Sequence, residues 1–318
     1  MREKELYVSA DGSKEFARIA DALAAAEQFR DCKVVIRIAA GVYKERLVVQ
    51  QEHISFVGED AAGTRITFSD FANDLMPEGD KRGTFRTPSV FIDADNFHAR
   101  GISFCNEAGQ GGKVGQALAV YADGDHLIFE DCRFEGYQDT LFTAPLPFKE
   151  KQPGGFKGPK EFAPRRVGRH LYKDCYIAGN VDFIFGSAIA YFENCEVFMR
   201  DRKGDVKGYV TAPSTYEGQE YGYVFQRCRF TSECPKESCY LGRPWRDYAK
   251  CVILNSEIGA HIRREGWHDW DRKEAWDTMF FAEYGNYGEG AGTQRAPFVK
   301  LLTAEEAAAY TRENVIGF

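Results

Sequence analysis

The chain has 318 residues, of which 44% are hydrophobic, and a formal net charge of -7 at pH 7. It is long enough to bury a large core, in one domain or two, and it has no low-complexity tract. No apolar stretch approaches the length of a transmembrane helix, which excludes a helical membrane protein. The charged start lacks a signal-peptide pattern and predicts a cytoplasmic protein, or a secreted one if a leader precedes this sequence.

The N-terminal segment predicts a helix and then a strand. Apolar residues recur at helical spacing from Phe16 to Ala26, after turn residues at 11–13. Alternating apolar residues from Val34 to Ile38 predict a strand. We expect the helix to cap one end of a stacked fold, because the end of a solenoid must be covered.

A short pattern recurs between residues 101 and 258, with one core residue between variable neighbours in each copy. The core positions are Ile102, Cys132, Cys175, Cys195, Cys228 and Ser256. They alternate with solvent-facing positions, as in short strands, and their uneven spacing indicates loops of different length between coils. We therefore expect an all-β chain, a single-domain right-handed parallel β-helix over residues 1–318.

The C-terminal segment predicts a second helical end. Thr303 followed by Glu306 has the pattern of a capping box. The Ala-rich stretch 304–310 is therefore predicted as a C-terminal helix.

The nine cysteines and six histidines are interpreted as structural. Four of the cysteines occupy the repeated core position, where a small thiol packs well. Cys234 and Cys239 are close enough to pair across a turn, although the odd total favours reduced thiols. The histidines show no metal-ligand spacing, so we predict no metal and no cofactor.

Two strings, QDTL at 138–141 and DFIFG at 182–186, place an acidic residue beside groups that cannot neutralise it. An ionised carboxylate among apolar neighbours is costly unless a partner pairs with it. The string LGRPW at 241–245 offers Arg243 on a Gly/Pro turn that could aim it at a carboxylate. Taken singly, each string has an ordinary alternative, an Asp that bonds its own turn or an Arg that solvates a loop.

Together with GVYKE at 41–45 and QALAV at 116–120, these strings stand in an order typical of one family. The chain resembles the pectin methylesterases, carbohydrate esterase family eight, from about Tyr7 to its C-terminus. The resemblance implies a parallel β-helix. It also implies a carboxylic ester hydrolase that removes methyl groups from methyl-esterified galacturonate and releases methanol.

The resemblance implies a role for each of five residues: Asp182 is the nucleophile, Asp139 the general acid and then base, Gln116 and Gln138 the oxyanion donors, and Arg243 the orienter. A carboxylate can attack an ester to form an acyl-enzyme, while a second, protonated carboxyl donates to the departing methoxide. A cation nearer one of two close carboxylates keeps that one charged. The alternatives for the two glutamines are a ladder amide for Gln116 and a turn cap for Gln138.

Four aromatic residues are candidates for flat walls against sugar rings: Tyr137, Phe185, Trp245 and Trp267. Packing in the core is the alternative, most of all for Phe185. Trp245 is the first choice, because it lies on the Gly/Pro turn beside Arg243.

The chain departs from the family between Phe142 and His170, where a Pro/Gly-rich stretch predicts a long loop. From Lys149 to His170 there are seven Lys or Arg residues and two Glu, a local charge of +5. Such a loop could attract galacturonate carboxylates or close one end of a groove against long polymers. An ordinary solvated loop is the alternative.

The expected partner is methyl-esterified oligogalacturonide or pectin, and we expect no nucleic acid, no membrane partner and a monomer. Two other classes stay open. One is a β-helix enzyme that cuts the pectin backbone by hydrolysis or elimination, and the other is a non-catalytic solenoid that binds saccharide or protein. Release of methanol without new reducing ends would distinguish the esterase from both.

Overall fold

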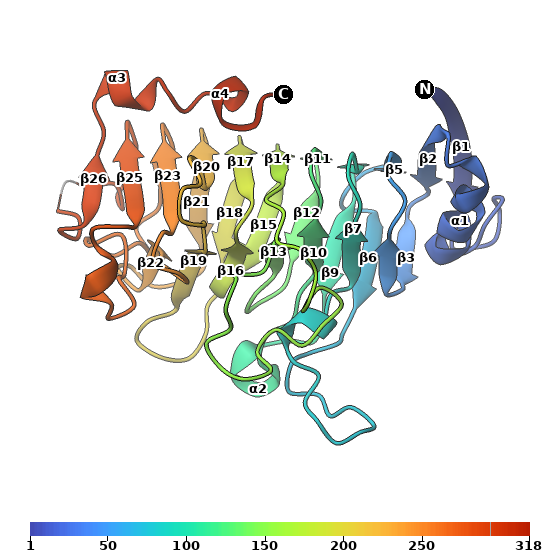
Figure 1. Ribbon diagram of the computed structural model, residues 1–318, viewed down its shortest axis with the longest axis horizontal. Coiled ribbons are helices and arrows are strands. Elements are labelled where there is room, and N and C mark those ends of the chain that lie inside the picture. Colours follow the sequence, from blue (N-terminus) through green and yellow to red (C-terminus); the bar gives the residue numbers. More distant parts are fainter. Residues whose placement is uncertain (293) are drawn as a thin grey trace.

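The computed structural model describes residues 1–292 and 294–318. Its strands run parallel and are stacked in successive coils (Figure 1). Each full coil contributes one strand to each of three sheets, and neighbouring strands in a sheet come from successive coils and run parallel. The right-handed parallel β-helix expected from the repeated pattern is confirmed.

Within the described residues, the strands form sheets of eleven, eight and seven members. The first sheet has the order β1 (Arg2–Val8), β2 (Cys32–Ile38), β5 (Ile54–Gly58), β8 (His98–Arg100), β11 (Leu127–Glu130), β14 (Arg169–Lys173), β17 (Ile189–Glu193), β20 (Tyr223–Gln226), β23 (Lys250–Leu254), β25 (Phe280–Tyr284) and β26 (Val299–Leu301). The second sheet has the order β24 (Glu257–Ile258), β21 (Arg229–Ser232), β18 (Glu196–Met199), β15 (Tyr176–Gly179), β12 (Arg133–Glu135), β9 (Ser103–Asn106), β6 (Thr64–Phe68) and β3 (Gly41–Lys44). The third sheet has the order β22 (Cys239–Gly242), β19 (Gly208–Pro213), β16 (Val181–Gly186), β13 (Leu141–Thr143), β10 (Val120–Asp123), β7 (Val90–Asp93) and β4 (Leu47–Val49).

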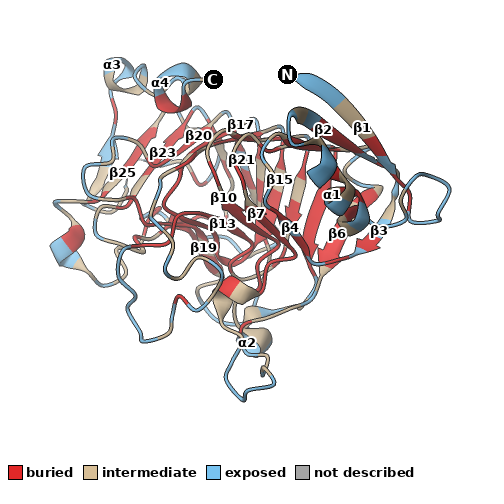
Figure 2. Cartoon of the chain, turned by 45° about the vertical axis from the view of Figure 1, so that its right-hand side comes forward, coloured by how far each residue is buried: buried red, intermediate tan, exposed pale blue. Residues whose placement is uncertain are grey.

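The six core positions predicted from the repeats are all buried, with at most 2% of each residue exposed. Figure 2 shows the buried residues along the inside of the coils, with exposed residues in the loops and at the ends. The chain turns from the first sheet to the second just before each core position. The turning residues all have positive φ: Gly101, Asp131, Asp174, Asn194, Arg227 and Asn255. Gly, Asn and Asp tolerate this backbone region best, which explains most of these choices.

Helix α1 (Ile19–Ala26) packs against β1 and β2 and covers the N-terminal end, so the predicted N-terminal helix is confirmed from Ile19 onward. A 3-10 turn, η1 (Glu27–Phe29), follows it. Short helical segments also occur in loops, at η2 (Thr84–Arg86), α2 (Gly111–Val114) and η3 (Lys273–Ala275).

The C-terminal end differs from its prediction in one respect. The capping box is present, because the Thr303 side chain accepts from the Glu306 N–H and the Glu306 carboxylate accepts from the Thr303 N–H. The helix it opens, α3 (Ala304–Ala307), is shorter than the predicted stretch 304–310. Thr311 caps a separate helix, α4 (Arg312–Ile316), which lies against β14 and β17 of the first sheet (Figure 1). Two caps eight residues apart therefore divide the segment into two short helices.

All nine cysteines are free thiols, as the odd total favoured. Among the residues that the structure describes, helices are too short and too polar to cross a bilayer.

Candidate active site

One cleft over the third sheet brings together all five residues predicted to be catalytic. It has a volume of about 480 Å³. Its lining includes Gln116, Gln138, Asp139, Asp182 and Arg243. These residues span 128 positions of the chain, from 116 to 243, and only the stacking of coils brings them to one place.

The third sheet positions these side chains on adjacent strands. Gln116 precedes β10, and the pair Gln138 and Asp139 precedes β13. Asp182 is the second residue of β16, and Arg243 directly follows β22. Since β10, β13 and β16 are neighbours and β22 lies one strand beyond β19, equivalent positions of successive coils meet at one surface.

Both acidic residues occupy irregular backbone. Asp139 has a φ of 62° and Asp182 a φ of 49°. The pairing of β16 with β19 shifts register between Val181 and Ile184, so the strand is irregular over the interval that contains Asp182. Such an irregularity can turn a side chain away from the regular pleat, as β-bulges often do beside an active site. The Asp139 N–H donates to the Val181 carbonyl at 3.0 Å, so the two irregular segments hold each other.

Arg243 and Asp182 form a two-pronged ion pair. Nε of Arg243 donates to Oδ1 of Asp182 at 2.8 Å, and Nη2 donates to Oδ2 at 2.7 Å. The guanidinium also lies between two aromatic rings, 3.8 Å from the centroid of Tyr209 and 3.6 Å from that of Trp270. A planar guanidinium stacked on both faces can rotate little, so the carboxylate that it holds is fixed as well.

The two carboxyl groups have different proton affinities. Burial, and then the negative charge of Asp182, raise the pKa of Asp139 well above its ordinary value, and Arg243 opposes this rise. Burial also raises the pKa of Asp182, but the charge of Arg243 and its hydrogen bonds work against that increase. As the pH rises, Asp182 therefore loses its proton before Asp139 does. The cation distinguishes the two carboxyls in the direction that the sequence predicted.

The amide side chains of Gln116 and Gln138 make no hydrogen bond to any described residue, and both are half-buried in the cleft wall. They are therefore free to donate to a ligand. Gly111 of α2 lies so close to Gln138 that a Cβ at position 111 would be 2.4 Å from Gln138 Oε1. The Gln138 amide can therefore occupy this position only because residue 111 is a glycine.

The profile of the Pectinesterase family matches residues 5–147 and 165–317. The chain belongs to the pectinesterase family. It is therefore an ester-hydrolysing enzyme, and the gap in the match, at 148–164, lies in the long loop between β13 and β14.

Relatives with known names agree with this assignment. The chain is 32% identical to Pectinesterase 31 of Arabidopsis thaliana, over 97% of this chain and 91% of that protein. It is 36% identical to Pectinesterase 1 of Citrus sinensis, over 98% of this chain but half of that longer protein. Among solved structures, pectin methylesterase from carrot is 32% identical with a TM-score of 0.84, covering 98% of this chain and 93% of that one. Pectin methylesterase PemA from Erwinia chrysanthemi is 30% identical with a TM-score of 0.80, covering 100% and 98%.

Two of the four aromatic residues predicted to contact substrate line the cleft of this pectinesterase, namely Phe185 and Trp245. Trp245 is half-buried, and its ring lies edge-on to Phe185 with 5.6 Å between centroids. Phe185 is 3% exposed and packs on Phe142 of the preceding coil at 4.8 Å. Trp245 therefore presents more surface to a ligand, while Phe185 mainly supports it.

The other two aromatic predictions do not fit the cleft. Trp267 is 1% exposed, stacks on Phe281 with 4.5 Å between centroids, and donates from Nε1 to Glu283 at 2.9 Å. A ring buried in this way cannot face a sugar, so the prediction for Trp267 is wrong. Tyr137 lies outside the cleft lining and contacts Arg200 instead, whose guanidinium is 5.0 Å from the ring centroid.

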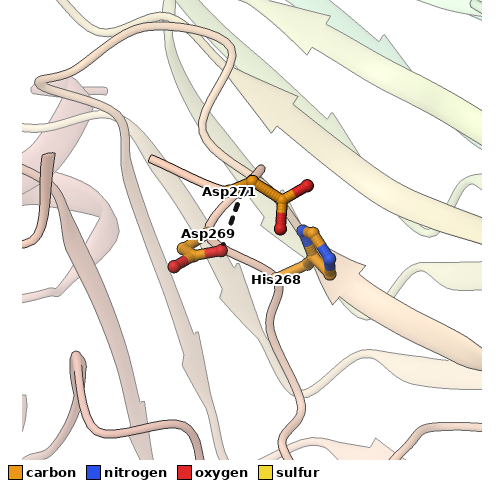
Figure 3. A group of neighbouring side chains, drawn as sticks. All are labelled: His268, Asp269 and Asp271. Carbon is orange, nitrogen blue, oxygen red and sulfur yellow. Dashed lines mark hydrogen bonds between the residues drawn. The ribbon is translucent and has the colours of Figure 1, made fainter. Parts of the chain in front are cut away.

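Trp270 lines the cleft and contacts Arg243, but the sequence did not single it out. It has a φ of 58° in a turn built by its neighbours. The Trp270 N–H donates to Nδ1 of His268 at 2.8 Å. The Asp271 N–H donates to Oδ1 of Asp269 at 2.9 Å, which is the hydrogen bond drawn in Figure 3. The available signal was the second tryptophan of WHDW at 267–270, three positions after a buried one.

The same turn gathers three side chains of metal-ligating type. Ligand atoms of His268, Asp269 and Asp271 lie within 4.8 Å of one another. His268 Nδ1 and Asp269 Oδ1 already accept the backbone N–H bonds of the turn, and Asp269 Oδ2 accepts from Nε1 of Trp276 at 3.0 Å. These bonds explain the group as the framework that holds Trp270 over Arg243. The absence of a metal cofactor stays a prediction.

Proposed function

We propose that this chain hydrolyses methyl esters of galacturonate, in pectin or oligogalacturonides, through an aspartyl acyl-enzyme. The observation that supports this proposal best is the fork of Arg243 on Asp182 beside Asp139, a carboxyl with a strongly raised pKa. Asp182 is thus oriented and loses its proton at the lower pH, while Asp139 retains its proton. Nucleophilic attack and proton donation need this division of roles.

In the first step, an Asp182 oxygen attacks the ester carbonyl carbon. The carbonyl oxygen becomes negatively charged in the tetrahedral intermediate and accepts hydrogen bonds from the amides of Gln116 and Gln138. Collapse breaks the bond to the methoxy oxygen, and the proton of Asp139 passes to that oxygen. Methanol leaves, and the galacturonyl group remains joined to Asp182 as an anhydride.

In the second step, the ionised Asp139 takes a proton from a water molecule as the water oxygen attacks the acyl carbon. The anhydride bond breaks, Asp182 leaves as a carboxylate, and Asp139 is protonated again. Ester and water are consumed, methanol and the galacturonic acid unit are formed, and the acid then releases its proton to solvent to give galacturonate. Throughout, Arg243 stabilises the carboxylate form of Asp182, which makes it a better leaving group in this step.

The proposed substrate is a chain of galacturonate units rather than a single sugar. One similar structure is described as a pectin methylesterase in complex with a hexasaccharide; it is 32% identical with a TM-score of 0.79 and covers 98% of this chain and 96% of that one. The open cleft of this chain, with Trp245 on one wall, fits an extended ligand that continues past the reacting ester.

The test is incubation of the protein with methyl-esterified oligogalacturonides, with methanol, reducing ends and unsaturated products measured in parallel. We expect methanol alone. New reducing ends would favour a hydrolase that cuts the backbone, and unsaturated products would favour a lyase. Saccharide binding without methanol would favour a non-catalytic solenoid, and any of these three results would overturn the proposal.

A further inference from the structure

The loop segment that the family profile does not match forms one wall of the cleft. This insertion, residues 148–164, contributes Lys151, Gln152, Gly154, Gly155 and Phe156 to the lining. The wall of this site is therefore built in part by residues that the family profile does not match. Its chemistry should distinguish the substrates of this chain from those of relatives without the segment.

The insertion is fixed to the body of the protein rather than free in solvent. Phe156 is 6% exposed and lies 5.9 Å from Phe85 and 6.4 Å from Trp245, measured between ring centroids. Nη2 of Arg246 donates to the Lys149 carbonyl at 3.0 Å. These contacts hold the two ends of residues 149–156, and Lys151 between them, against one side of the cleft.

Most of the positive charge of residues 149–170, which include most of the insertion, is already neutralised. Cations of this stretch pair with carboxylates of neighbouring coils: Lys157 with Asp80, Lys160 with Asp93, Arg166 with Asp95 and Arg169 with Asp125. The general attraction for anions that the sequence suggested is therefore mostly cancelled inside the protein. Any anion binding must come from the cations that remain.

Three cations of the cleft wall have no carboxylate oxygen within 4.0 Å among the described residues: Lys151, Arg246 and Lys81. Lys81 donates instead to Oδ1 of Asn73 at 2.9 Å. Burial, and then the charge of Arg272, lower the pKa of Arg246 to about 10. Burial, and then the charges of Arg272 and Arg246, also lower the pKa of Lys151. The nearby Arg243 and Arg272 are each paired with a carboxylate, Asp182 and Asp247. The local field therefore has an excess of positive charge that an anionic ligand would relieve.

Building on the proposed function, we propose that Lys151 and Arg246 bind the free carboxylate of an un-esterified galacturonate beside the ester that is hydrolysed. The reacting ester is neutral, so it cannot supply the anion that these two cations need. Every neighbouring unit of the substrate chain carries either a methyl ester or a carboxylate. The substrate class selected by this subsite is a partly de-esterified oligogalacturonide, which is also the product of an earlier round of the same reaction.

The first experiment compares two hexagalacturonates, one with every carboxyl methylated and one with alternate carboxyls free. The measurement is kcat/KM for methanol release at low ionic strength. Wild type should favour the partly esterified hexamer, and Lys151→Gln should reduce that preference about tenfold, since a hydrogen bond between charged groups is lost. Lys149→Gln removes the same charge two residues away, outside the cleft lining, and should keep the wild-type preference.

The second experiment measures binding of fully un-esterified hexagalacturonate by calorimetry. Lys151→Gln should weaken binding about tenfold relative to Lys149→Gln, and added salt should reduce this difference. Equal affinity of the two variants, or a wild type that favours the fully methylated hexamer, would overturn the subsite. Failure of the proposed function gives a different result, which is no methanol from either hexamer, while calorimetry still tests the subsite.

Discussion

Arg243 reaches both carboxylate oxygens of Asp182, at 2.8 and 2.7 Å, across 61 positions of sequence. The guanidinium is held by stacking between Tyr209 and Trp270, so the pair has a defined orientation toward the cleft. This relationship underlies the proposed chemistry, because it selects which of two buried carboxyls is the nucleophile.

Replacing Arg243 with Lys should lower kcat about a hundredfold or more, with a smaller change in KM. A lysine keeps the positive charge but contacts one oxygen at a time and does not stack between two rings, so the carboxylate loses its orientation. Steady-state methanol release tests this, and circular dichroism checks the fold. Activity equal to wild type would mean that the fork is not needed.

Replacing Asp182 with Asn should lower methanol release by about a thousandfold or more, because an amide cannot form the acyl-enzyme. Binding of un-esterified oligogalacturonide should remain measurable by calorimetry. A variant that still turns over near the wild-type rate would exclude Asp182 as the nucleophile and transfer attention to Asp139.

Replacing Asp139 with Asn should stabilise the protein increasingly as the pH rises. The pKa of Asp139 is raised well above its ordinary value of 3.8, so between these two values the folded protein binds more protons than the unfolded chain. Wild type therefore loses stability across this range as the pH rises, by about 1.4 kcal/mol for each unit of pKa difference. The Asn variant has no such proton to lose.

Thermal melts of wild type and Asp139→Asn from about pH 4 to about pH 8 measure this effect. Asp277→Asn, which removes an exposed carboxyl, serves as the control. A melting-temperature difference between Asp139→Asn and wild type that stays constant over the range would show that burial does not shift the proton affinity of Asp139.

The fold could be predicted because each coil repeats one inward position, and the same small residues recur there. That five distant residues meet in one cleft could be predicted because the motifs that carry them stand in an order typical of the family. The direction in which a turn orients its side chains could not be predicted. Trp267 and Trp270 are three residues apart, yet one lies in the core and the other lines the cleft. Trp270 and Asp271 both have positive φ, and a tryptophan gives no sign in the sequence of that backbone region.

The effect of the charged residues between 149 and 170 could also be predicted only in part from the sequence. Counting residues gives the sign of the loop, but its carboxylate partners come from residues 80 to 125 and meet it only after the coils stack. The sequence therefore overstated the field that a substrate would meet.

Trp267 and Trp245 should respond differently to replacement by alanine, the first in stability and the second in substrate binding. Trp267→Ala should destabilise the fold by about 3 to 5 kcal/mol, since it removes a fully buried ring and leaves a cavity. Trp245→Ala should instead raise KM with a smaller loss of stability, because Trp245 is half-buried at the cleft. Thermal melts and Michaelis parameters distinguish these effects. A Trp267→Ala variant that melts like wild type but binds substrate poorly would restore Trp267 as a substrate contact.

The close approach of Gly111 to Gln138 predicts an effect from a single methyl group. In Gly111→Ala the new Cβ would lie 2.4 Å from Gln138 Oε1, so the amide must move. If that amide stabilises the oxyanion, kcat should fall about tenfold or more while KM changes little, because the interaction is made mainly in the transition state. Gly112→Ala is the matched control, since it adds the same group to the same short helix and meets nothing within 4 Å.

Methanol release by Gly111→Ala, Gly112→Ala and Gln138→Ala together decides the matter. Both alanines in α2 gain the same helix propensity, so a fall in kcat at position 111 alone cannot come from helix stability. A fall in Gln138→Ala without one in Gly111→Ala would mean that the amide tolerates displacement and that its exact position does not limit the rate. Full activity in Gln138→Ala would remove this residue from the oxyanion site and leave Gln116, the other glutamine assigned to that role, whose amide also makes no hydrogen bond to a described residue.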